Sequence, residues 1–151
     1  MRIYISDRHP LCRLALKLTL VRAGHEVVGE NAEVCLPELL SAQPDLTIME
    51  GARAVTNLED TIHEIRIRRC PTKIIVWADP DSLKSLTPEA DGLIFKEDDC
   101  WERFLPAMNS IMAGEQWIDV KAVVEPQPFF SNNCARAIRL KSAPTYDYNL
   151  T

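Results

Sequence analysis

The stretch Pro44-Asp45-Leu46-Thr47-Ile48-Met49-Glu50 decides the fold, because it contains a short apolar run that ends at a polar residue. Four other runs have the same form: residues 3–5 before Asp7, 27–28 before Glu30, 74–77 before Asp79 and 93–95 before Lys96. Segments long enough for helices separate these runs. The alternation predicts buried parallel strands joined by crossover helices. The polar residues at the run ends should then gather at the carboxyl edge of the sheet, where open α/β folds build their sites.

The composition predicts one domain with a tail, without a membrane span. The chain has 151 residues, a formal net charge of -5 and a pI of about 5.2, which disfavours binding of nucleic acid by electrostatics alone. No apolar run approaches the roughly 20 residues that span a bilayer. The five cysteines form neither a CxxC pair nor a metal-ligand spacing, and we expect reduced thiols in a cytoplasmic protein.

The helical segments carry apolar residues on more than one face. After His9-Pro10 we expect a helix that Gly24 ends. Its predicted inward stripe consists of Leu11, Leu14, Ala15, Leu18 and Val21. Leu16 and Leu20 fall off this stripe. The last helix is expected to begin near Asp98 or Asp99, to end at Gly114 and to carry an apolar stripe that includes Trp101, Phe104 and Met108.

The character of the chain changes near its carboxyl end. Prolines, serine and asparagines follow Glu125, and residues 142–151 are polar and aromatic without a period. We therefore predict a domain over residues 1–122 and an extension and linker over 123–151. Only a short helix of two turns at most is expected between the two prolines Pro80 and Pro88.

Four motifs in order resemble those of one known family. They are Ser6-Asp7-Arg8-His9-Pro10-Leu11, the stretch from Pro44 to Glu50, Ala90-Asp91-Gly92-Leu93-Ile94-Phe95-Lys96, and Ala113-Gly114-Glu115-Gln116-Trp117. Residues 1 to about 122 resemble a response-regulator receiver domain of the LuxR/NarL-type transcription regulators. The resemblance implies a flavodoxin-like α/β fold, with a five-stranded parallel sheet in the order 2-1-3-4-5 and helices on both faces, which is the strand order of flavodoxin itself.

The resemblance also shows which site residues depart from the family pattern. Receivers are phosphorylated on an aspartate beside Mg²⁺ and an acidic pair; here Glu50 stands at the acceptor position and Arg8 replaces the second acid. Asp7 and the site lysine, Lys96, are retained. Trp77 occupies the position of a small hydroxyl residue, and Leu93 the position of the aromatic switch residue. The site is therefore expected to be a degenerate phospho-acceptor site.

The substitutions predict a site without Mg²⁺ and without catalytic residues. Mg²⁺ requires oxygen ligands in octahedral geometry, which an arginine does not supply. A guanidinium 4 Å from the dication would cost about 8 kcal/mol at an effective dielectric constant of 20. We expect Arg8 to act as an internal cation that pairs with Glu50 or Asp7. The simpler alternatives are an exposed surface arginine at Arg8 and plain core filling by Trp77.

The expected function is that of a pseudo-receiver: a regulatory domain, not an enzyme, that works without phosphorylation and forms a homodimer. Leu16, Leu20, Trp101, Phe104 and Met108 are the candidate dimer residues, with ordinary core packing as the alternative. Asn149-Leu150-Thr151 resembles the start of a LuxR-type helix-turn-helix domain. DNA binding is therefore expected through such an attached domain of a parent protein. The alternatives are a receiver-like sensor of a small molecule or protein ligand, and a phosphorylatable regulator with a non-standard acceptor.

Overall fold

A computed structural model describes residues 1–51, 58–80, 89–97 and 100–119, which belong to a compact unit over Met1–Asp119. Its strands are β1 (Arg2–Ser6), β2 (Glu26–Asn31), β3 (Leu46–Gly51), β4 (Lys73–Ala78), β5 (Gly92–Phe95) and β6 (Trp117–Ile118). Its helices are α1 (Pro10–Arg22), α2 (Leu36–Ala42), α3 (Leu58–Ile67) and α4 (Cys100–Met112). The expected short helix between Pro80 and Pro88 and the tail over 123–151 lie outside the described residues.

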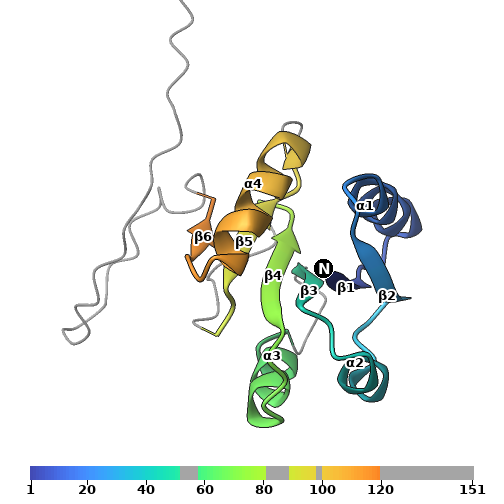
Figure 1. The fold of residues 1–151 in the computed structure, drawn as a ribbon, viewed down its shortest axis with the longest axis vertical. Helices are drawn as coiled ribbons and strands as arrows, with labels where there is room; N and C mark the ends of the chain where they lie inside the picture. Colours follow the sequence, from blue (N-terminus) through green and yellow to red (C-terminus); the bar gives the residue numbers. More distant parts are fainter. Residues whose placement is uncertain (52–57, 81–88, 98–99, 120–151) are drawn as a thin grey trace, which may run out of the picture. The chain divides into compact units, whose positions relative to one another are not determined.

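All the strands form one parallel sheet in the order β2-β1-β3-β4-β5-β6. The flavodoxin-like class and the order of the first five strands are confirmed. Helices α1 and α4 cover one face of the sheet and α2 and α3 the other, as Figure 1 shows. Because the strands run in parallel, the residues that follow β1, β3 and β5 meet at one edge.

The prediction of five strands was wrong by one, because Trp117–Ile118 adds β6 beside β5. The carboxylate of Asp119 holds this short strand: Phe95 N–H donates to Asp119 Oδ2 at 2.8 Å, and the guanidinium of Arg103 on α4 pairs with the same oxygen. Gly92 allows α4 to approach closely, since a Cβ there would lie 2.4 Å from Ile111 Cδ1. These tertiary contacts stabilise a two-residue strand that the local pattern does not specify.

The two faces of α1 are the reverse of the prediction. Leu16 and Leu20 are fully buried against the sheet, whereas Leu11, Leu14, Leu18 and Val21 are 80%, 51%, 48% and 53% exposed. The loop before the helix sets this orientation. His9 N–H donates to Asp7 Oδ1 at 2.7 Å, and Arg13 Nη1 donates to the carbonyl oxygen of Asp7. The pattern of apolar residues does not show which of the two apolar faces is buried. The hydrogen bonds before the helix fix its start and are consistent with the observed orientation.

The burial of α1 and α4 also corrects the candidate dimer residues. Leu16, Leu20, Phe104 and Met108 are all 0% exposed and belong to the core between α1, α4 and the sheet. For these four, the alternative of core packing holds, because a side chain without exposed surface does not meet a second copy. Trp101 is 37% exposed and is the one member of the set that reaches the surface.

Candidate functional site

Four charged side chains from three strand ends meet at the carboxyl edge of the sheet. Asp7 and Arg8 follow β1, Glu50 lies near the end of β3, and Lys96 follows β5. Asp7 and Glu50 are buried, with 1% and 6% of their surface exposed. The sequence prediction that these residues lie together is therefore confirmed in geometry. We refer to Asp7, Arg8, Glu50 and Lys96 as the charge cluster.

Lys96 lies at the centre of the charge cluster and bridges its two acids. The Nζ atom donates to Asp7 Oδ2 at 2.8 Å and to Glu50 Oε1 at 3.3 Å. The lysine side chain is only 11% exposed, so this ammonium gives up most of its water. The two buried carboxylates replace that water and make the desolvated charge tolerable.

Arg8 completes the charge cluster from its outer side. Its main-chain N–H and its Nε donate to Glu50 Oε2 at 3.0 and 3.3 Å. The expected pairing of Arg8 with an acid is thus found with Glu50, although a third of the arginine side chain, 34%, remains exposed. Arg8 therefore flanks the acids, and the ammonium of Lys96 holds the position between them. Glu50 thus pairs with both Arg8 and Lys96.

The pKa directions follow from these contacts. Burial by itself raises the pKa of Glu50, but the Arg8 main-chain N–H and the Lys96 charge outweigh it and hold this pKa below its ordinary value of 4.5. Burial opposes the charged form of Lys96 as well. The hydrogen bond and charge of Asp7, with the charge of Glu50, nevertheless raise the pKa of Lys96 above 10.5. Glu50 and Lys96 are therefore both charged at neutral pH.

The residues present do not fit the Mg²⁺ ion that receivers use. Each of the four side-chain oxygens of Asp7 and Glu50 already accepts an N–H, since Asp7 Oδ1 accepts the main-chain N–H of His9. Two acids and two cations also make the charge cluster neutral, so a dication would find no excess negative charge. Among the described residues, no group of three or more His, Cys, Asp or Glu side chains is placed to hold a metal.

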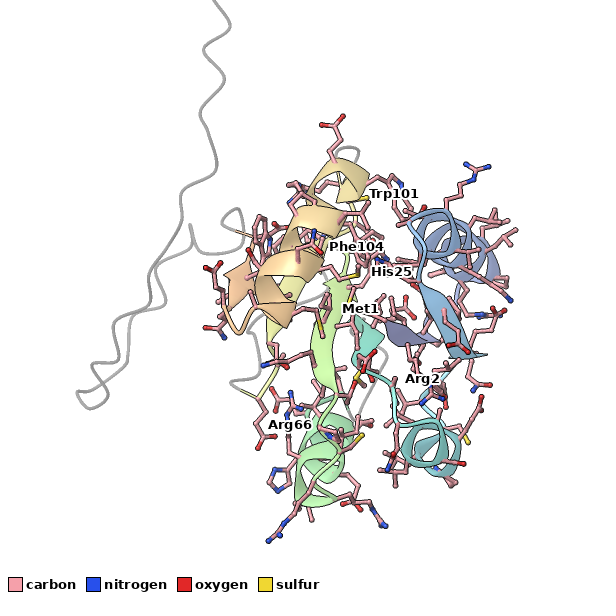
Figure 2. The ribbon with its side chains drawn as sticks, in the orientation of Figure 1. Met1, Arg2, His25, Arg66, Trp101 and Phe104 are labelled. Atoms are coloured by element: carbon pink, nitrogen blue, oxygen red, sulfur yellow. The ribbon has the colours of Figure 1, made fainter. Side chains whose placement is uncertain are left out.

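Trp77 lies beside Glu50 in the sheet, because the two are register partners on β4 and β3. Its indole ring packs against α4, with ring centroids 5.3 Å from Phe104 and 5.4 Å from Trp101 (both labelled in Figure 2). The residue is 2% exposed, so it fills the core. Its indole Nε1 is buried without a hydrogen-bond partner, which is uncommon for a buried polar atom. Obstruction of a phosphoryl group by this indole stays a prediction.

Leu93, at the position of the switch residue, is 3% exposed and packs in the core on the α2 and α3 face. A leucine lacks the hydroxyl and the flat ring of an aromatic switch residue, and this one lies in a closed core. Sequence reasoning missed two groups that support the site. They are Arg13, which holds the Asp7 carbonyl, and the His9 imidazole, whose Nε2 lies 3.7 Å from Glu50 Oε1. The positions of Arg13 and His9 in the sequence do not by themselves predict these contacts.

A polar hollow of about 400 Å³ lies at the opposite, amino edge of the sheet. Arg66 and Lys73 line it, and both pair with Asp91 at 2.8 and 2.9 Å. Arg66 belongs to α3, and Figure 2 labels it at the opposite end of the view from Trp101 on α4. Asp91 already neutralises both cations. An anionic ligand would therefore have to break these ion pairs in order to bind in the hollow.

Comparison with known proteins places this fold among receiver domains. A scan against models of known protein families matched none of them. A protein of Pseudomonas aeruginosa, provisionally described as a transcriptional regulator, is 29% identical over 120 residues, which cover 75% of this chain. The match covers 57% of that protein, so the chain corresponds to little more than half of its length.

Solved structures of receiver domains share the fold at low identity. A structure of RcsB dimers bound to DNA has a TM-score of 0.69 and 17% identity, with 81% of this chain and 64% of that chain covered. A LuxR-family response regulator from Aurantimonas sp. SI85-9A1 has a TM-score of 0.65 and 21% identity, covering 80% and 91%. One from Silicibacter pomeroyi has a TM-score of 0.59 and 19% identity, covering 82% and 99%. The chain has the flavodoxin-like receiver fold of LuxR/NarL-type response regulators.

Proposed function

We propose that this chain is the regulatory domain of a transcription regulator and that it works without phosphorylation. The observation that carries the proposal is the neutral charge cluster, in which Lys96 lies between Asp7 and Glu50 and Arg8 flanks Glu50. An Mg²⁺ ion would have to displace cations that these acids already bind. Glu50 then serves as a permanent, hydrogen-bonded anion. It carries one negative charge, which is less than the about 1.5 to 2 negative charges that a phosphate adds.

The names of the relatives support the regulatory role, and we also propose a cytoplasmic location. The Pseudomonas protein is described as a transcriptional regulator, and the RcsB structure contains dimers bound to DNA. We propose that this chain also acts as a homodimer, and that DNA binding belongs to an attached domain of a longer protein. In the described part of the chain, no helix is both long and apolar enough to cross a membrane.

The proposal is tested by offering the protein a phosphoryl donor. The chain is incubated with Mg²⁺ and acetyl phosphate, and its intact mass is measured, with Glu50→Gln treated in parallel. We expect no phosphoryl adduct on either protein. An adduct on the wild type that Glu50→Gln abolishes would establish Glu50 as an acceptor and overturn the proposal. Both proteins are also treated with beryllofluoride, which mimics a phosphoryl group, and are followed by NMR. This second measurement detects binding at the site even if a phosphoryl adduct is too short-lived for mass spectrometry.

A further inference from the structure

Strand β6 lies at the edge of the sheet, beside β5 and α4, and has only two residues (Figure 1). Strands in globular proteins usually have about five or six. Its main-chain contacts with β5 include the Trp117 N–H on the Asp91 carbonyl at 3.2 Å and the Asp119 N–H on the Leu93 carbonyl at 3.1 Å. The side chains of Trp117 and Ile118 are half-buried and pack on opposite faces of the sheet. Main-chain pairing over so short a length contributes little, so side-chain contacts have to hold this strand.

The carboxylate of Asp119 takes the place of a main-chain partner for β5. In a parallel ladder, main-chain carbonyls accept the N–H groups of the neighbouring strand, but here the N–H of Phe95 donates to Asp119 Oδ2 at 2.8 Å. The other oxygen, Oδ1, accepts the indole N–H of Trp117 at 3.3 Å. Asp119 is buried, so its charge requires a cation, and Arg103 of α4 supplies one.

Arg103 is shared between two acids. Its Nη1 pairs with Asp119, and its Nη2 lies 3.4 Å from Glu97 Oε2. Glu97 follows Lys96, the central cation of the charge cluster, directly in the sequence. Arg103 therefore keeps an acidic partner when it loses Asp119, so the release of Asp119 does not leave this cation without a counter-charge.

We propose that Asp119 and Arg103 form a latch that couples the charge cluster to β6. The charge cluster holds the carboxyl end of β5 through Lys96, and the latch holds the same end through the main chain of Phe95, one residue earlier. A change that draws Lys96 away from its acids displaces the end of β5, weakens the bond from Phe95 and releases β6, while Arg103 keeps its other acid. The inference deepens the proposed function and rests on it only for the idea that the charge cluster is the regulated site.

The main chain around Lys96 makes this coupling direct. The Lys96 N–H donates to the Ala78 carbonyl at 2.8 Å, and the Glu97 N–H donates to the Phe95 carbonyl at 2.9 Å. Residues 95–97 are thus one bonded segment, and a displacement of Lys96 reaches Phe95 across a single peptide bond. Coupling between two sites is reciprocal, so release of the latch must also loosen the charge cluster.

Hydrogen exchange in the full chain tests the coupling from the charge cluster to β6. In Lys96→Met the Asp119 N–H should exchange about tenfold faster than in the wild type, within the roughly 5–150-fold range of coupled sites. The Glu26 N–H, bonded at the opposite edge of the sheet, is the internal reference. Leu39→Ala is the matched control, because it destabilises the fold at a fully buried position on α2 and should leave the Asp119 exchange within about twofold. Equal acceleration in both variants, or none in Lys96→Met, would overturn the inference.

A milder variant covers the case in which Lys96→Met does not fold. Glu50→Gln removes one of the two carboxylates that bind Lys96 and keeps Asp7. The Asp119 N–H should then exchange about threefold faster, because the hold on Lys96 is weakened and not lost. Wild-type exchange at Asp119 in this variant would count against the latch.

Acylation of lysines by acetic anhydride tests the reverse direction. The Lys96 side chain is 11% exposed in the folded protein, whereas that of Lys17 on α1 is 46% exposed. In Asp119→Asn the loosened end of β5 should let Lys96 react about tenfold faster, while Lys17 keeps its wild-type rate. Peptide mass spectrometry measures both rates, and Glu102→Gln, exposed on α4, is the matched control. An unchanged Lys96 rate in Asp119→Asn would contradict the coupling. No phosphoryl donor enters these experiments, so the latch and the phosphorylation-independent site can fail separately.

Discussion

Lys96 and Asp7 are 89 residues apart in the chain, yet the lysine Nζ lies 2.8 Å from Asp7 Oδ2. β3 and β4 separate the strands that carry these residues, so the lysine side chain reaches across the carboxyl edge of the sheet. The contact ties the first strand to the fifth and places a positive charge between two buried acids. The stability of the fold and the chemistry of its site therefore depend on the same ion pair.

Removal of this central cation should be costly. In Lys96→Met, Asp7 and Glu50 stay buried without the ammonium that both of them bind, and breaking a buried ion pair costs about 3–5 kcal/mol. Urea denaturation should show a loss of this size in the free energy of unfolding. Arg68→Met is the control, because its ion pair with Glu64 is exposed and contributes about 0.5 kcal/mol. Similar losses in both variants would show that the charge cluster contributes no more to the free energy of unfolding than an exposed ion pair does.

The pH dependence of stability should have an acid limb from Glu50. Its pKa is lower in the folded protein than its ordinary 4.5, so the folded state holds its charge where the unfolded chain takes up a proton. This contribution is present above pH 4.5 and is lost as the pH falls through the lowered pKa. In Glu50→Gln the free energy of unfolding should fall less steeply below pH 4.5. Glu33→Gln, at an exposed position, should keep the wild-type slope.

Lys96 should produce the opposite limb at alkaline pH. Because folding raises its pKa above 10.5, its contribution is complete below pH 10.5 and is lost as the pH rises through the raised value. Denaturation curves between neutral pH and the alkaline range should show this loss in the wild type. The same curves for Lys96→Met should lack it, and an unchanged alkaline slope in that variant would contradict the assignment.

The sixth strand should depend on Asp119. Its carboxylate is 5% exposed, binds Arg103 and accepts the Phe95 N–H, and hydrogen bonds to charged groups contribute about 1.5–3 kcal/mol. Asp119→Asn should therefore lower the free energy of unfolding by about 1–3 kcal/mol and speed hydrogen exchange at Phe95 and Asp119, whose N–H groups bond within this edge. Glu102→Gln, exposed on α4, is the control and should change neither. Unchanged exchange in Asp119→Asn would show that β6 is held by other contacts.

The sequence predicted the layers of the fold because the apolar runs of buried parallel strands are local signals. It also predicted that Asp7, Glu50 and Lys96 would meet, since strand ends share one edge. The prediction of the buried face of α1 was wrong, because both faces are apolar and the hydrogen bonds around Asp7, which fix the start of the helix, leave no local pattern. The two-residue strand β6 was missed for a related reason: Asp119 and Arg103 hold it by tertiary contacts that no local pattern records.

The central claim is that the charge cluster replaces Mg²⁺, and a titration with Mg²⁺ tests it most directly. Isothermal calorimetry and NMR of the wild type should show no saturable binding and no shift of the Asp7 or Glu50 resonances at millimolar Mg²⁺. Arg8→Asp/Glu50→Asp, which adds an acid and shortens the other, should gain saturable binding. Saturable binding by the wild type, with Arg8 released from Glu50, would contradict the account.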